Sequence, residues 1–180
     1  MLNLDRISRE FARQAAISSP SRREGAMARY LADRFTALGG VIEWDDTGAK
    51  IGGEADNLIA RFAATGRDTA PLMLSVHMDT VEPCANVQPQ LQNGIFTSAG
   101  ETILGSDDKS GIAEIIEALE ILREERMVFN VEVFEATLGE CCAGESRSRR
   151  CLDAADGQGC SQDHGADHQH PLQLFSHSRS

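Results

Sequence analysis

The sequence has few basic residues and no long apolar run. Its 180 residues contain 17 Lys and Arg against 28 Asp and Glu, which gives a net charge of -11. No basic run is longer than the pair Arg149-Arg150, so nucleic acid and anionic membrane surfaces would be poor partners. No window approaches the roughly 18 apolar residues of a membrane span, and residues 1–6 lack the apolar core of a signal peptide. We therefore expect a cytoplasmic protein with a small or cationic ligand.

A second absence concerns the end of the chain. Residues 141–180 contain no Val, Ile, Met, Lys, Tyr or Trp, whereas Val and Ile recur throughout the first 134 residues. Four of the five Cys and four of the five His also lie after Glu140. This change predicts a boundary near residue 140, between a folded unit (residues 1–140) and an irregular, disordered tail (residues 141–180).

The N-terminal part predicts two amphipathic helices. Apolar residues at helical spacing indicate a helix over residues 3–17. A second helix is expected to begin at Ser21, because Ser21 and Glu24 have the capping-box spacing in which two side chains satisfy free amides at a helix start. The pair Gly39-Gly40 would end this helix.

Apolar segments separated by Gly- and Asp-rich turns predict several strands. They cover residues 41–44, 57–62, 71–77 and 128–133. Residues 72–76 are apolar nearly throughout, so their strand is expected at the centre of a sheet, covered on both faces. The dipeptide Asn93-Gly94 favours a tight hairpin turn.

A further helix is expected over residues 109–125, with isoleucines and leucines on one side and glutamates mostly on the solvent side. Helices that alternate with apolar strands predict an α/β fold. In such folds ligands gather at the carboxyl ends of the strands.

Two short acidic motifs are the main candidates for a functional site. In the first, residues 75–80 read Ser-Val-His-Met-Asp-Thr at an expected strand end. Side chains two residues apart on a strand lie on the same side, so Asp79 can accept one ring proton of His77 and leave the other nitrogen for a metal. The alternative is a strand-end histidine that only hydrogen-bonds to a loop.

The second motif opens the later helix, where residues 105–111 read Gly-Ser-Asp-Asp-Lys-Ser-Gly. Negative charge is favoured at a helix start, but the adjacent carboxylates of Asp107 and Asp108 repel each other unless a cation offsets their charge. Alone, this motif could be an acidic cap followed by an exposed Lys109. Together the two motifs indicate a divalent-metal site.

Residues 74–81 and 102–113, with the helix junction at residues 17–21, resemble the dinuclear zinc peptidase family of tripeptide aminopeptidase, or peptidase T. Aminoacylases and succinyl-diaminopimelate desuccinylases are relatives within that family. The resemblance covers residues 1–140, and the Thr-Ile-Leu-Gly-x-Asp-Asp-Lys pattern with the Asn-Gly hairpin before it favours the peptidase T-like branch. It implies a zinc-exopeptidase-like sheet flanked by helices, present here as an incomplete catalytic domain.

The resemblance also implies a role for each matching residue. His77 would bind one of two zinc ions, Asp79 would orient His77, and Asp107 would bridge the ions, with a cis peptide to Asp108. Glu140 matches the general base that takes a proton from the zinc-activated water, and Lys109 would serve the helix surface or a loop. The implied activity is zinc-dependent aminopeptidase hydrolysis of short peptides.

The family pattern ends at residue 140. A second Glu, a zinc ligand in the family, is replaced here by Cys141, and no later carboxylate or histidine ligand is recognisable. A shift of reading frame near codon 140 would produce such a break, and the nucleotides should then continue with family-like residues in another frame. A genuine short variant is the alternative.

Three functions are compatible with these observations. The first is a zinc aminopeptidase whose activity is impaired in this chain. The second is a non-catalytic fragment with partial metal binding, because affinity depends on the full ligand set. The third is an amidohydrolase acting on N-acyl amino acids, since one metal core can serve both reactions. The full-length family can dimerise, but the resemblance places its dimerisation domain outside this sequence.

The Cys and His residues after Glu140 allow one further hypothesis. Cys160, His164, His168 and His170 could bind a metal, but standard finger spacing is lacking and few apolar residues surround them. We therefore expect adventitious metal binding there rather than a structural zinc module. Cys84 is interpreted as a small filler without a role.

Overall fold

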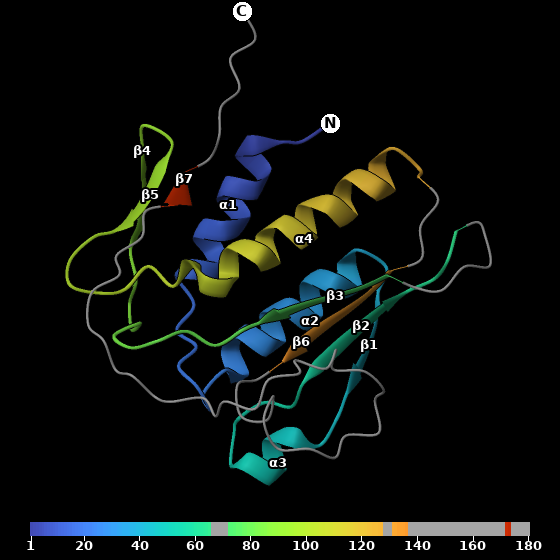
Figure 1. Ribbon diagram of the computed structural model, residues 1–180, viewed down its shortest axis with the longest axis horizontal. Coiled ribbons are helices and arrows are strands. Elements are labelled where there is room, and N and C mark those ends of the chain that lie inside the picture. Colours follow the sequence, from blue (N-terminus) through green and yellow to red (C-terminus); the bar gives the residue numbers. More distant parts are fainter. Residues whose placement is uncertain (66–71, 128–130, 137–171, 174–180) are drawn as a thin grey trace, which may run out of the picture.

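The computed structural model describes residues 1–65, 72–127, 131–136 and 172–173, and Figure 1 shows how the elements are arranged. In chain order they are α1 (Leu4–Ala15), α2 (Gly25–Ala37), β1 (Val41–Trp44), α3 (Thr47–Ile51), β2 (Leu58–Phe62), β3 (Leu72–His77), β4 (Pro89–Gln92), β5 (Ile95–Ser98), α4 (Ser106–Glu124), β6 (Val131–Ala136) and β7 (Leu172–Gln173). Helices flank a sheet, which confirms the predicted α/β class. No helix in the described ranges is long and apolar enough to cross a membrane.

Within the described residues, four strands form the main sheet in the order β1-β2-β6-β3. The strand β2 is antiparallel to both of its neighbours, whereas β3 and β6 are parallel and are joined through α4. His77, the last residue of β3, is the register partner of Ala136, the last residue of β6. The carboxyl ends of these two strands therefore lie at the same edge of the sheet.

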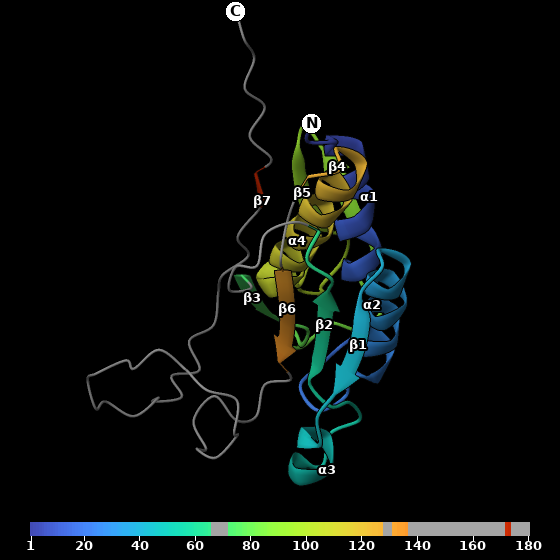
Figure 2. The same ribbon diagram turned by 90° about the vertical axis from the view of Figure 1, so that its right-hand side faces the viewer.

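The main core lies between this sheet and the helices α2 and α4. It is formed by Leu31 and Phe35 of α2, Leu58 of β2, and Ile112 and Ile116 of α4, all at most 1% exposed. In Figure 2 the strands β3, β6, β2 and β1 lie side by side from left to right, and α2 lies beside β1. Burial of these apolar side chains is the main force that holds α4 and the strand β3 in place.

The helix α1 and the hairpin β4–β5 form a second apolar cluster beside α4. The rings of Phe11 and Phe96 meet edge to face, with centroids 4.8 Å apart. The predicted tight turn is confirmed, because Asn93 and Gly94 have φ angles of 52° and 77°.

The strand β3 is not the covered central strand that its apolar sequence predicted. Among the described strands it pairs only with β6, and Leu72 and Met73 are 59% and 56% exposed. Leu74 and Val76 do pack against the main core. An apolar run indicates that a strand suits a buried environment. The elements that would cover the other edge and face of β3 are not among the described residues.

The start of α2 also differs from the prediction. The helix begins at Gly25, and its first turn has no side-chain cap. The Ser21 hydroxyl instead donates to Asp79 Oδ2 at 2.5 Å, and Glu24 Oε1 accepts the amide of Arg22 at 2.5 Å. The capping-box prediction was wrong because a partner far away in the sequence binds Ser21.

One glutamate of α4 is not on the solvent side. Glu117 is 2% exposed and accepts hydrogen bonds from Arg6 Nε at 2.5 Å and from the Asn3 amide at 2.8 Å. The other glutamates of the predicted solvent face are exposed or half-buried. Helical periodicity could not show that α1 packs over Glu117.

Candidate metal centre

The strand β3 leads directly into the first motif. Met78 is fully buried in the main core, so the strand's alternation turns His77 and Asp79 to the opposite side. Asp79 is 2% exposed, and the next residue, Thr80, donates its amide to the Ser19 carbonyl at 2.8 Å. A buried anchor and a backbone hydrogen bond thus fix the loop on either side of Asp79.

Asp79 holds one side of the His77 ring. His77 Nδ1 lies 3.0 Å from Asp79 Oδ1 and 3.1 Å from the Asp79 carbonyl oxygen. The hydrogen bond to the Asp79 carboxylate raises the pKa of His77 to about 9, because it favours the protonated ring. Loss of a proton at Nε2 would leave Nδ1–H donated to Asp79 and the Nε2 lone pair free for a metal.

Two glycines shape the second motif. Gly105 has a φ of +71°, and a Cβ there would lie 2.9 Å from Thr80 Cγ2. A Cβ on Gly111 would lie 2.3 Å from Asp108 Oδ1, so a larger residue would displace that carboxylate. Both close approaches require glycine, and the one at Gly105 brings the start of α4 against the loop after β3.

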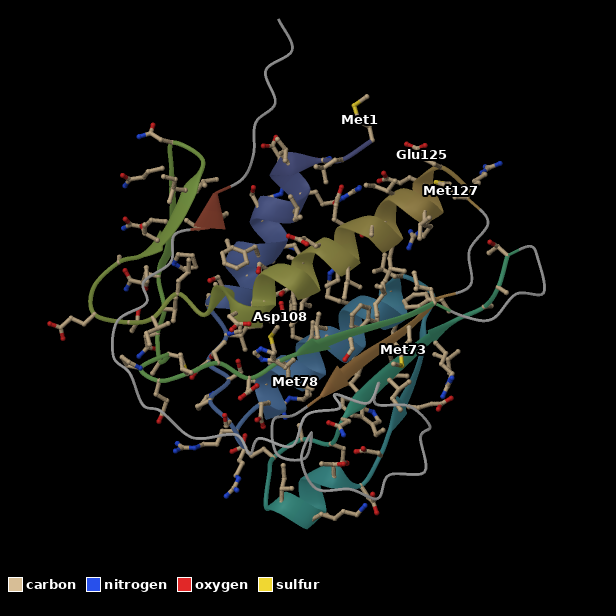
Figure 3. The ribbon with its side chains drawn as sticks, viewed as in Figure 1. Met1, Met73, Met78, Asp108, Glu125 and Met127 are labelled. Atoms are coloured by element: carbon tan, nitrogen blue, oxygen red, sulfur yellow. The ribbon has the colours of Figure 1, made fainter. Side chains whose placement is uncertain are left out.

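Asp107 and Asp108 interrupt the first turn of α4. Both have non-helical dihedral angles, and the peptide bond between them is cis, as the family resemblance implied. Figure 3 shows Asp108 at the start of α4. Burial raises the pKa of Asp108, whereas the side chain of Asp107 is 94% exposed. The two neighbouring carboxylates therefore have different environments, and Asp107 is the one that is open to a ligand.

The two motifs meet at His77 and Asp107. His77 Nε2 lies 3.2 Å from Asp107 Oδ1. Two ligands of one tetrahedral zinc, each about 2.0–2.1 Å from the ion, stand about 3.3 Å apart. The donor spacing therefore fits a shared metal ion. The described residues contain no group of three or more His, Cys, Asp or Glu that could hold a metal, so the two side chains would supply only part of a zinc ligand set.

Lys109 was expected to serve the helix surface or a loop. It does not lie on the helix surface, but it does bind the loop between α1 and α2. It is 1% exposed and donates from Nζ to the Ile17 carbonyl at 2.6 Å. Burial lowers the pKa of Lys109 to about 8, because the charged form loses its hydration. The side chain thus joins the start of α4 to the segment that follows α1.

The structure brings together three of the four predicted site residues. His77, Asp79 and Asp107 are in contact, whereas Glu140 lies outside the described residues, as do Cys141 and the Cys and His residues of the tail. Cys84 is buried, with Sγ 3.7 Å from Ser18 Oγ. Sequence reasoning missed Ser21, because its spacing from Glu24 indicated a local cap.

Several known proteins are similar to this chain in sequence and in fold. No family model matches the sequence. YqjE, an uncharacterized protein of Bacillus subtilis, is 36% identical over 140 residues, which are 78% of this chain and 38% of that protein. The crystal structure of aminopeptidase PepT from Bacillus cereus matches with a TM-score of 0.73 and 34% identity, over 76% of this chain and 37% of that one. This chain is peptidase T-like.

A second solved structure supports the same relationship. A tripeptidase from Staphylococcus aureus matches the peptidase T-like chain with a TM-score of 0.73 and 31% identity, over 76% of this chain and 37% of that one. The chain thus spans about 38% of the length of the curated relative that it matches. These two solved structures are peptidases, and the chain is similar to one part of their fold.

Proposed function

We propose that this peptidase T-like chain forms part of the metal site of a zinc-dependent, cytoplasmic aminopeptidase that hydrolyses short peptides. The spacing of His77 Nε2 and Asp107 Oδ1, 3.2 Å, carries the proposal, because it matches two ligands of one zinc ion. The similarity to an aminopeptidase and a tripeptidase supports the substrate class.

Each residue of the site has a proposed part in this reaction. His77 and Asp107 would hold zinc, and Asp79 keeps the His77 ring in place. When bound, zinc polarises the scissile carbonyl and the attacking water. The free ammonium of a peptide substrate suits a chain with a net charge of -11.

Glu140 is the proposed general base, which accepts the proton of the attacking water. Its position in the sequence supports this role, because Ala136 pairs with His77 across the sheet and Glu140 follows four residues later.

A non-catalytic fragment is the second candidate function. Two observations favour it: the described residues supply only His77 and Asp107 as facing donors, and the chain spans 38% of its relative YqjE. A metal site with part of its ligands binds weakly, because affinity and geometry depend on the full set.

Zinc content and peptide turnover of the purified chain test these candidates. The aminopeptidase proposal expects bound zinc and hydrolysis of tri-alanine that His77→Ala abolishes and that Ser8→Ala, at a half-buried residue of α1, leaves unchanged. Binding of less than one zinc without turnover would establish the fragment. Turnover of N-acetyl amino acids in place of tri-alanine would instead establish the amidohydrolase alternative.

A further inference from the structure

The segment between α1 and α2 contacts both loops of the candidate metal centre. The Ser19 carbonyl accepts the amide of Thr80 at 2.8 Å, and Pro20 forms a parallel bridge with Thr80. The Ile17 carbonyl accepts the Lys109 ammonium at 2.6 Å. One short stretch of chain is therefore bonded to the loop after β3 and to the start of α4.

Within this segment, Ser21 touches the centre most directly. Its Oγ donates to Asp79 Oδ2 at 2.5 Å, while Asp79 Oδ1 faces His77 Nδ1 at 3.0 Å. Each oxygen of this buried carboxylate thus has its own partner. The carboxylate cannot rotate without breaking a hydrogen bond at one end or the other.

Ser21 is itself held by a local turn. Arg22 has a φ of 70°, and its amide donates to Glu24 Oε1 at 2.5 Å. Glu24 is fully buried, so the turn that presents Ser21 is anchored in the protein interior. A serine on a fixed turn can orient a carboxylate, whereas one on a free loop would not.

We propose that Ser21 is a positioning residue of the metal centre: its hydroxyl holds Asp79 in the orientation that directs His77 Nε2 towards Asp107. The metal part of this inference rests on the proposed function. The orientation of Asp79 and His77 does not, because it is a property of the metal-free chain.

Three variants of the full 180-residue chain isolate the Ser21 hydroxyl. Ser21→Ala removes it, and Ser21→Thr keeps it at an exposed position with room for the added methyl group. Ser19→Ala is the matched control: this buried hydroxyl has no hydrogen-bond partner among the described residues, and the backbone bond from Thr80 remains.

The first readout is the His77 Nδ1–H signal in proton–nitrogen NMR of the metal-free chain, assigned by its loss in His77→Ala. In the wild type, a proton held by a carboxylate should resonate far downfield and exchange slowly. In Ser21→Ala it should move upfield and exchange at least about tenfold faster, because the Asp79 carbonyl remains as the better-placed acceptor. Ser21→Thr and Ser19→Ala should match the wild type.

The second readout is the zinc dissociation constant, measured by competition with a chromophoric chelator. Loss of a group that orients a metal ligand typically weakens binding by about 10- to 100-fold, which is the expected effect of Ser21→Ala alone. If the wild type binds no zinc but Ser21→Ala changes the Nδ1–H signal as stated, the proposed function fails and the positioning role stands.

The positioning role is overturned by any of three results. The first is an Nδ1–H signal that is absent in the wild type or unchanged in Ser21→Ala. The second is a change of this signal in Ser19→Ala that equals the change in Ser21→Ala. The third is a signal in Ser21→Thr that does not match the wild type. Zinc binding that remains equally tight in wild type and Ser21→Ala, with an unchanged signal, would leave the proposed function intact.

Discussion

At the scale of single residues, His77 makes the stability of the metal-free chain depend on pH. Its pKa is raised to about 9 by Asp79, so the folded state keeps a proton that an unfolded histidine loses near pH 6.5. The added stability is therefore present below about pH 6.5 and is lost as pH rises through about 9. Asp79→Asn should flatten this part of a stability profile measured by urea unfolding. An identical profile in Asp79→Asn would show that Asp79 does not raise the pKa of His77.

Lys109 has the opposite effect at higher pH. Burial lowers its pKa from 10.5 to about 8, so between these values the unfolded chain binds more protons than the folded chain. Stability contributed by this group should therefore rise from about pH 8 to pH 10.5. Lys109→Met should remove that rise in the same urea experiment, and Lys50→Met, at an exposed lysine, should retain it. A rise that persists in Lys109→Met would contradict the assignment.

The sequence could predict some of these residue contacts and not others. His77 ends β3 and Asp79 follows two positions later, so their contact is local in the sequence. Ser21 and Lys109 bond to partners 58 and 92 positions away, and no local pattern contains that information. The base role of Glu140 remains a prediction, as do the metal roles of His77 and Asp107.

At the scale of elements, an ion pair docks α1 onto α4. Arg6 reaches the buried carboxylate of Glu117 and also the exposed one of Glu124. Arg6→Ala would leave Glu117 buried without its cation, which should lower the free energy of unfolding by about 3 kcal/mol. Lys50→Ala, which breaks an exposed pair with Asp46, should change it by less than about 0.5 kcal/mol. Chemical denaturation measures both, and similar small losses would show that the docking does not depend on Arg6.

The types of the elements followed from the sequence better than their surroundings. Strand β1 has the predicted bounds. The bounds of α1, β2 and α4 each lie within a few residues of those predicted for the same element. The errors at β3 and Ser21 have one cause. Periodicity and capping patterns describe a residue's local chain, whereas the edge position of β3 and the Ser21–Asp79 bond depend on segments that meet only in the folded molecule.

At the scale of the whole molecule, the exposed strand β3 should make the chain associate. Leu72 and Met73 present apolar surface on a strand that is an edge among the described strands. Met73→Lys should reduce concentration-dependent association in analytical ultracentrifugation, because a charged side chain opposes edge pairing. Leu2→Lys, at an equally exposed residue outside the sheet, should not. A wild-type chain that stays monodisperse would contradict this prediction.

The most direct test of the account is the zinc affinity of a double-mutant set, because its central claim is that His77 and Asp107 hold one ion together. Isothermal titration of zinc into the wild type, His77→Ala, Asp107→Ala and the double variant gives four dissociation constants. Shared coordination predicts that each single variant loses nearly as much affinity as the double variant. Losses that simply add, or zinc binding that neither substitution weakens, would contradict it.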